Sequence, residues 1–158
     1  MSLGQHRAMG SHTYETHLRW SGSTGEGLRA YSRNHAATAP PAASETALSA
    51  DPAFGGDPAR LNPEQLVVMA ASSCQMLSFL GAAARAGVDV LSYRDRATSH
   101  LDLEAGRLST VHLAVTVEVA AGTGEARVRE LAEAAHRTCF VANSLSVPVE
   151  VAVAVVAG

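Results

Sequence analysis

Two cysteines are the residues of this chain best suited to carry chemistry. Cys74 and Cys139 each fall on the apolar stripe of a segment with helical spacing, and each has polar neighbours. A thiolate can act as a nucleophile, as a metal ligand or as one partner of a disulfide. A free cysteine can also be a small buried hydrophobe without any reactivity. Spacing alone leaves both interpretations open.

A metal site is a weaker interpretation of the same residues. Zinc needs convergent cysteine and histidine ligands at recognisable spacings, and the sequence has neither a CxxC nor an HExxH motif. His136 lies three residues before Cys139, and we interpret it as a surface or capping residue. We predict no metal and no cofactor.

Composition predicts one small α+β domain. The chain has 158 residues, 47% of them hydrophobic, which is enough for one core. The net charge of −3, the lack of a basic block and the 4% aromatic content argue against nucleic acid and anionic membranes as partners. We expect residues 1–11 to be a tail or a cloning remnant and residues 12–158 to be a single domain.

The chain is predicted to be cytoplasmic and to have no membrane segment. Its first residues lack the apolar region of a secretory signal. The apolar run over residues 147–158 is shorter than the ~20 residues that span a bilayer. Because the cytoplasm keeps most thiols reduced, a disulfide here would be transient rather than a permanent structural link.

The first 60 residues predict a β-hairpin followed by a loop. Polar and apolar residues alternate over residues 12–20 and 28–37, and a glycine-rich turn over residues 21–27 separates them. Proline and glycine recur over residues 39–60, which predicts a long loop. Such a loop can cover a functional site or be a disordered connection, and both interpretations stay open.

A helix is predicted to begin at Pro63. Asn62 supplies a cap and Gln65 can return a bond to it, while Glu64 is an acid in the first turn. Apolar residues then recur at helical spacing until Gly87. The stripe places Cys74 on a largely buried central helix, and it consists of Leu66, Val67, Ala70, Ala71, Cys74, Leu77, Leu80 and Gly81.

The second half predicts another hairpin, a helix and a last strand. Alternation over residues 88–103 and 107–119 indicates two strands around a turn at Ala105-Gly106. Helical spacing over residues 123–139 turns Cys139 inward, and alternating valines over residues 147–155 indicate a strand with one buried face. The predicted order is ββ-α-ββ-α-β.

Two segments resemble one protein family. Residues 62–66 (NPEQL) with residues 70–74 (AASSC) are similar to the central helix of OsmC/Ohr proteins, including the ten-residue step from Glu64 to Cys74. Residues 134–145 (AAHRTCFVANSL), ahead of a terminal strand, resemble that family's resolving-cysteine segment. The resemblance extends over residues 12–157 in element order, and it identifies the chain as a member of the broader OsmC-like branch of the OsmC/Ohr superfamily.

The resemblance implies a fold, an activity and partners. The fold would be an intertwined homodimer in which a central helix packs on antiparallel sheets. Cys74 would reduce organic hydroperoxides, and hydrogen peroxide as well, and Cys139 would resolve the resulting sulfenic acid as a disulfide. A lipoyl-type or other small dithiol would then reopen that disulfide.

The resemblance also implies an arginine that activates Cys74 and is oriented by Glu64. The sequence departs from the Ohr pattern where this arginine is expected, and leaves Arg29, Arg33 and Arg60 as candidates. We favour Arg33, because it shares a face of the second predicted strand with Tyr31 and His35. Each arginine could instead be a solvated surface charge.

A continuous helix would hold Glu64 and Cys74 about 15 Å apart, too far for one arginine to bridge comfortably. We therefore predict a helix break near Ser72-Ser73, which would place Cys74 in a new first turn. If the helix is straight, Glu64 is only a first-turn acid. An apolar pocket for the substrate, or alternatively ordinary core, could be formed by Phe54, Met69, Met76, Phe79 and Phe140.

Two other kinds of function remain open. A non-catalytic protein of the same fold could bind an apolar molecule or sense oxidants, and it would need neither a depressed Cys74 pKa nor a disulfide to Cys139. A structural stress protein would tolerate the loss of Cys74.

Overall fold

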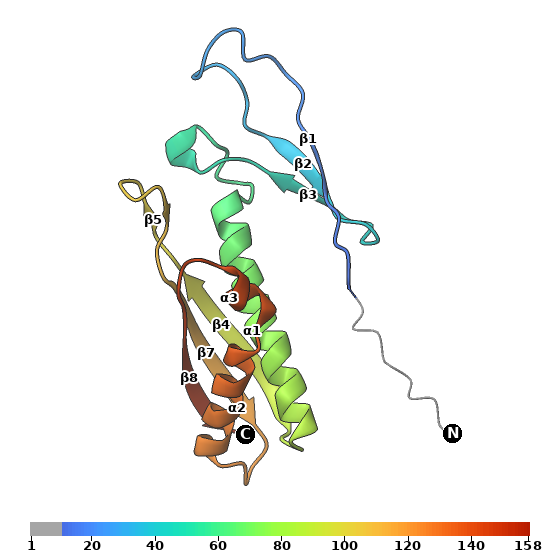
Figure 1. Ribbon diagram of the computed structural model, residues 1–158, viewed down its shortest axis with the longest axis vertical. Coiled ribbons are helices and arrows are strands. Elements are labelled where there is room, and N and C mark those ends of the chain that lie inside the picture. The colour runs from blue at the N-terminus through green and yellow to red at the C-terminus, as the bar shows by residue number, and fades with distance from the viewer. Residues whose placement is uncertain (1–10) are drawn as a thin grey trace, which may run out of the picture. The chain divides into compact units, whose positions relative to one another are not determined.

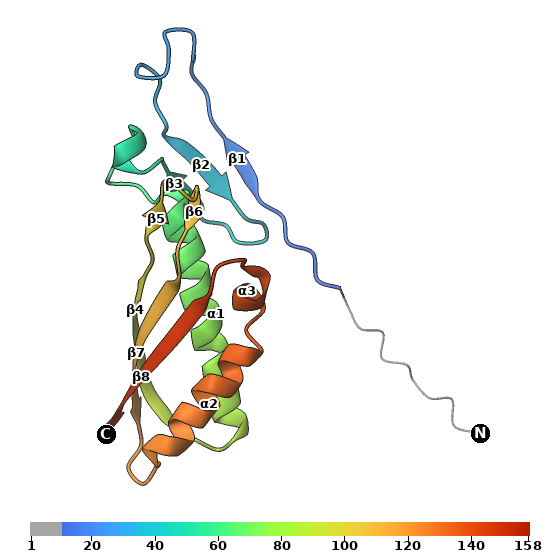
Figure 2. The ribbon, with the colours of Figure 1, turned by 60° about the vertical axis from the view of Figure 1, so that its left-hand side comes forward.

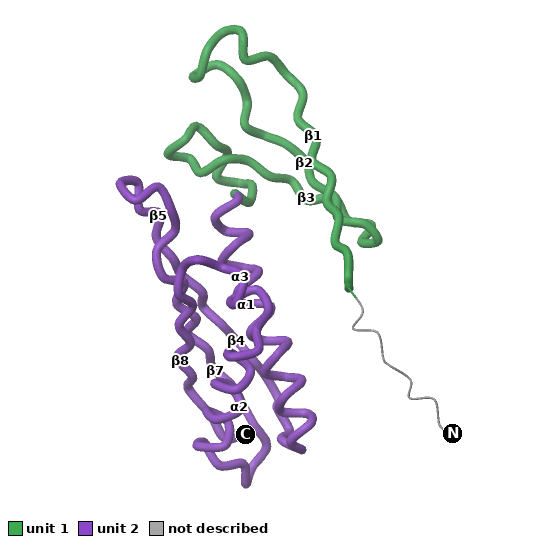
Figure 3. Tube along the Cα trace, in the orientation of Figure 1, with its two compact units in different colours: residues 1–62 green, residues 63–158 purple. Residues whose placement is uncertain are grey.

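The computed structural model describes residues 11–158, which form two compact units (Figures 1 and 3). Residues 1–10, most of the predicted tail, lie outside the described residues. The N-terminal unit runs to Asn62, and the C-terminal unit is Pro63–Gly158. We describe each unit by itself, and a single domain over residues 12–158 stays a prediction.

The N-terminal unit is a three-stranded antiparallel sheet in the order β1-β2-β3. The strands are β1 (His17–Arg19), β2 (His35–Thr38) and β3 (Glu45–Leu48), and His35 pairs with Leu48. The prediction that residues 39–60 are all loop was wrong, because β3 and the short 3-10 helix η1 (Pro52–Phe54) lie within them. The Asp51 side chain caps η1 by accepting from the Ala53 N–H at 2.8 Å.

The long helix α1 (Pro63–Arg85) begins where the sequence predicts and is continuous. The expected break near Ser72-Ser73 was wrong. The Ser72 hydroxyl donates to Asp95 on the neighbouring sheet at 2.5 Å, so it is not used as a backbone cap. The helix ends at Arg85, and Gly87, two residues later, has a φ of +70° that is readily adopted only by glycine.

The sheet of the C-terminal unit has the order β4-β7-β8. Strands β4 (Val90–Thr98) and β7 (Val111–Val119) are antiparallel, and the short strands β5 (Leu101–Asp102) and β6 (Arg107–Leu108) extend their hairpin. The predicted alternation in β7 is confirmed, because one face is fully buried and consists of Val111, Leu113, Val115, Val117 and Val119.

Strand β8 (Val149–Ala157) runs parallel to β7, so the prediction of purely antiparallel sheets was wrong. A parallel neighbour requires a crossover connection, which α2 (Glu125–Arg137) and α3 (Phe140–Ser144) provide here. The predicted helix over residues 123–139 is confirmed in a shorter form as α2, and the short helix α3 that follows it was not predicted. The Thr138 hydroxyl bonds back to the carbonyls of Ala134 and Ala135, and Cys139 adopts extended backbone before α3.

The helices α1 and α2 cover the same face of this sheet (Figure 2). Between them lies the core, which includes Ala71, Phe79 and Ala83 of α1, the inner face of β7, and Val128, Leu131, Ala132 and Ala135 of α2. The fold is thus mixed α+β, as predicted.

The helix α1 also passes a test for membrane-spanning helices by length and composition alone. The prediction of no membrane segment rested on the apolar run over residues 147–158, and α1 is longer than that run. A core helix passes the same test, and the buried residues of α1 pack into the core of the C-terminal unit. The opposite face of α1 is exposed and carries large apolar residues, including Leu66, Met69 and Leu77.

The packing predicts that Phe79→Ala will lower the free energy of unfolding by about 3–5 kcal/mol, because a fully buried ring is removed from a core that cannot collapse around it. Urea denaturation of the reduced protein measures the change. Leu103, 74% exposed at the tip of the β5–β6 hairpin, supplies the control. Leu103→Ala should change the free energy by about 0.5 kcal/mol or less. Equal losses for the two variants would contradict this assignment of the core.

Candidate active site: the thiol pair

The C-terminal unit brings the two cysteines into contact. Both are free thiols, and their side chains are hydrogen-bonded to one another. Cys74 lies in the middle of α1 and is partly exposed, whereas Cys139 is fully buried between α2 and α3. The pair joins the central helix to the crossover connection.

The start of α3 supplies further donors to the Cys74 sulfur. Cys139 is the N-cap of this short helix, and its carbonyl accepts from the Asn143 N–H at 3.0 Å. The first amides of a helix have no partner within the helix, so those of Phe140 and Val141 are available to donate to Cys74. The Ser78 hydroxyl, one turn further along α1, donates to the same sulfur.

The two thiols have opposite pKa shifts. Burial raises the pKa of Cys74, but the bonds from Cys139, Val141, Ser78 and Phe140 together outweigh it, and the pKa lies below its ordinary value. Burial raises the pKa of Cys139, and the bond to Cys74 raises it further. Cys74 is therefore the thiol that ionises first, and Cys139 keeps its proton and donates it.

Glu64 does not reach this pair along α1. It lies in the first turn and is partly buried, ten residues before Cys74 in a continuous helix. At 1.5 Å per residue the separation is about 15 Å. The straight helix favours the interpretation of Glu64 as a first-turn acid that stabilises the helix dipole.

The three candidate arginines all belong to the N-terminal unit. The Arg33 guanidinium donates to the carbonyls of Leu28 and Tyr31 and stacks 4.0 Å from the centre of the Tyr31 ring. Arg33 and Tyr31 precede β2, so the expectation that they share a strand face with His35 was wrong.

The other two candidates have simpler surroundings. Arg29 is exposed, and Arg60 pairs with Asp57 at 3.4 Å. Whether Arg33 or one of these two activates Cys74 stays a prediction.

The proposed apolar pocket residues have different environments. Phe79 is fully buried and its ring contacts Tyr93 at 5.9 Å between centroids, so it is core. Met69 is half-exposed and Phe140 is 84% exposed. Within residues 11–158, no group of three or more histidine, cysteine or acidic side chains could hold a metal ion.

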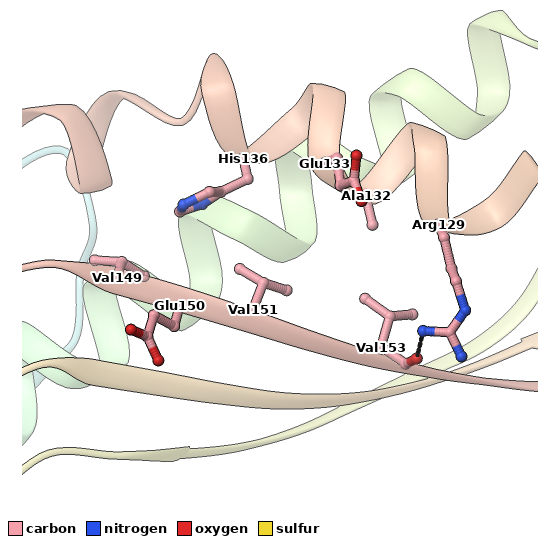
Figure 4. A pocket seen from close by; sticks show the side chains of 8 residues that line it. All are labelled: Arg129, Ala132, Glu133, His136, Val149, Glu150, Val151 and Val153. Carbon is pink, nitrogen blue, oxygen red and sulfur yellow. Dashed lines mark hydrogen bonds between the residues drawn. The ribbon is translucent and has the colours of Figure 1, made fainter. Parts of the chain in front are cut away.

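A groove of about 380 Å³ lies between α2 and β8, and no cysteine lines it (Figure 4). Val149, Val151 and Val153 form its apolar side, and the Arg129 guanidinium donates to the Val153 carbonyl at one end. His136 lines the other end, and its Nδ1 atom is buried without a hydrogen-bond partner. His136 is thus a groove residue rather than a cap.

Sequence reasoning missed the polar residues around Cys74. Ser78 stands four residues after Cys74, so helical spacing alone could have identified it as a neighbour. Asp95 lies between Tyr93 and Ala97 on the partly buried face of β4. A carboxylate is unusual at such a position, so the alternation of the strand could have identified it. Burial and the charge of Asp95 raise the pKa of Tyr93.

Comparisons with known proteins agree with this architecture. A family model described as OsmC-like protein matches residues 55–154. An OsmC-like protein of unknown function from Vibrio cholerae is 29% identical, with a TM-score of 0.79 over 91% of this chain and all of that one. A comparison with curated proteins yields no match.

Two further solved structures, both of lower identity, share the fold. The organic hydroperoxide resistance protein OhrB of Bacillus subtilis is 17% identical, with a TM-score of 0.60 over 92% of this chain and 98% of that one. An organic hydroperoxide resistance protein from Legionella pneumophila is 18% identical, with a TM-score of 0.64 over 91% of this chain and 96% of that one.

The unequal pair predicts how the reactivity of the reduced protein depends on pH. Because the pKa of Cys74 is lowered, its alkylation by iodoacetamide should stay fast below the ordinary thiol pKa and slow only as pH falls through the lowered value. Ser78→Ala should move that midpoint to higher pH, because one donor to the thiolate is lost. Peptide-resolved mass spectrometry measures the rate at each cysteine. Faster alkylation of Cys139 than of Cys74 would contradict the assignment.

Proposed function

The chain belongs to the OsmC-like family, and on that premise we propose that it is a thiol-dependent peroxidase. Cys74 is the attacking thiol, Cys139 is the resolving thiol, and organic hydroperoxides are the substrates, with hydrogen peroxide as a smaller alternative. The observation that carries the proposal is the contact of two free thiols with opposite pKa shifts. The printed names of the Bacillus and Legionella relatives support the same class of substrate.

The first step oxidises Cys74 and reduces the peroxide. The thiolate sulfur attacks the terminal oxygen of ROOH, the O–O bond breaks, and the alkoxide leaves and takes up a proton as the alcohol. Cys74 becomes a sulfenic acid. The amides of Phe140 and Val141 stabilise the thiolate before this step, and their fixed positions need no rearrangement.

The second step uses Cys139. Cys139 loses its proton, its thiolate attacks the Cys74 sulfenic sulfur, and a disulfide forms as hydroxide leaves and takes up a proton to become water. The charge on Cys74 is one reason for the raised pKa of Cys139, and that charge disappears when the sulfenic acid forms. Oxidation of Cys74 thus removes one cause of the raised pKa of Cys139, so Cys139 ionises more readily. A small dithiol reductant, of lipoyl type or another, restores both thiols by exchange.

The functional form is proposed to be a cytoplasmic homodimer. The exposed face of α1 carries Leu66, Met69 and Leu77, and exposed apolar residues that lie together are typical of an interface. In β1 all three residues are exposed as well. A second copy of the chain that covers these surfaces would account for their composition.

A second candidate function is redox sensing without turnover. The same thiol pair supports it, since a sensor needs only one reversible oxidation. The two candidates differ in recycling, because an enzyme must be reduced repeatedly by a dithiol and a sensor need not be.

One equivalent of cumene hydroperoxide should remove both thiols of the reduced protein and two hydrogens from its mass. Cys139→Ser should accumulate a trappable Cys74 sulfenic acid, since the resolving thiol is absent. Cys74→Ser should keep its remaining thiol. Intact mass and free-thiol counts measure these results, and repeated cycles with dihydrolipoamide separate an enzyme from a sensor. Thiols that remain unchanged after minutes in the wild-type protein would refute the peroxidase.

Arg33→Ala should slow oxidation of Cys74 by cumene hydroperoxide by about tenfold or more, because a guanidinium stabilises the negative charge that develops on the leaving oxygen. Stopped-flow fluorescence or rapid-quench mass analysis measures the rate. Arg29→Ala is the matched control and should react like the wild-type protein. Loss of rate in Arg29→Ala or Arg60→Ala, with Arg33→Ala unchanged, would assign the role to a different arginine.

A further inference from the structure

The turn of α1 that carries Cys74 is held by two polar side-chain bonds. On one side, the Ser72 hydroxyl donates to Asp95 Oδ2 of β4 at 2.5 Å. On another side, the Gln75 amide Nε2 donates to the Ala132 carbonyl of α2 at 3.1 Å. The two bonds lie before and after Cys74 in the sequence, and they tie the same turn to two different elements.

Both bonds involve polar groups where apolar residues would be expected. Gln75 is fully buried, and its Oε1 atom has no hydrogen-bond partner. Asp95 lies on the inner face of β4, and its Oδ1 atom is buried without a partner. Unsatisfied buried polar atoms are destabilising, so stability alone does not explain these side chains.

The large apolar side chains of α1 that pack into the core, Val68, Phe79 and Leu80, lie before and after the turn that carries Cys74. The fully buried positions of α1 are Ala71, Gln75, Phe79 and Ala83, so Phe79 is the one large apolar side chain among them. A small side chain such as Ala71 makes few contacts, so it constrains the orientation of this turn less than a large one would. The position of the Cys74 sulfur therefore depends on directional bonds near that residue.

We propose that Asp95 and Gln75 are positioning residues, which fix the rotation of α1 so that the Cys74 sulfur meets the amides of Phe140 and Val141. The inference rests on the proposed function, because it concerns the thiol that attacks the peroxide. Neither residue touches the reacting atoms. The titratable neighbour of Asp95 is Tyr93 on the same strand, and that of Cys74 is Cys139.

The test compares Asp95→Leu with the conservative Asp95→Asn in reduced protein. Asp95→Leu removes the acceptor of the Ser72 bond, and we expect Cys74 oxidation by cumene hydroperoxide to slow about tenfold to a hundredfold, since a displacement of about 1 Å can have that effect. The alkylation midpoint of Cys74 should move to higher pH in the same variant. Asp95→Asn should stay within about threefold of wild type, because its amide oxygen can accept the same bond.

Ser92→Ala is the matched control. The Ser92 hydroxyl donates to Glu118 Oε2 at 3.0 Å, so this variant also removes a serine–carboxylate bond of β4, but one that joins β4 to β7 rather than to α1. Its rate and alkylation profile should equal those of wild type. Gln75→Leu should resemble Asp95→Leu.

Wild-type rates and alkylation profiles in folded Asp95→Leu and Gln75→Leu would overturn the proposal. If Asp95→Leu does not fold, Ser72→Ala provides the test, because it removes the same hydrogen bond at its partly exposed donor. An unchanged alkylation midpoint of Cys74 in Ser72→Ala would also overturn the proposal. Failure of the peroxidase function gives a different result. In that case the wild-type protein does not react with cumene hydroperoxide, while the shifts in the alkylation midpoint remain measurable.

Discussion

The candidate site of the C-terminal unit depends on the contact between the Cys74 sulfur in the middle of α1 and the start of α3. That contact requires the chain to return across α1 after β7. A parallel β8 imposes such a return, because a parallel strand can be reached only by a crossover. The crossover breaks after Arg137, and the new helix directs its first amides at Cys74. The parallel pairing of β8 with β7 thus places hydrogen-bond donors beside Cys74 on α1 and so lowers the pKa of its thiol.

The balance at Cys74 is between burial and hydrogen bonding. Full burial can raise a thiol pKa by several units, which would keep Cys74 protonated and unreactive. Four donors offset this effect and reverse it, with the Cys139 thiol the largest of them. The same geometry raises the pKa of Cys139, which in the proposed mechanism would stay protonated until Cys74 is oxidised.

Much of the fold could be predicted from local patterns, and the errors have identifiable physical causes. The start of α1 follows from Asn62 and Pro63, and the buried face of β7 follows from strict alternation. Strand direction could not be inferred, because alternation is the same in parallel and antiparallel sheets. Strand β3 was missed because its four residues lie within a stretch rich in alanine and proline.

The helix breaks show why local signals were insufficient for the site. Adjacent serines at residues 72 and 73 resemble a cap, yet the Ser72 hydroxyl bonds to β4 and the helix continues. The break falls instead at Thr138, where the hydroxyl bonds to preceding carbonyls. Whether a helix continues or ends at these hydroxyl residues thus depends on which acceptor the fold places near the hydroxyl. Ser78 could have been found from spacing, whereas Asp95 required the pairing of β4 with α1.

The lowered pKa of Cys74 changes the role that the expected arginine would have in the proposed site. The sequence suggested that a cation is needed to produce the Cys74 thiolate. The lowered pKa of Cys74 instead has its causes within the C-terminal unit, in two thiol or hydroxyl donors and two backbone amides. In the proposed mechanism an arginine would therefore be free to act on the peroxide, where a guanidinium could bind the oxygens and stabilise the leaving alkoxide. In the proposed peroxidase, production of the thiolate and recognition of the peroxide would therefore be separable tasks.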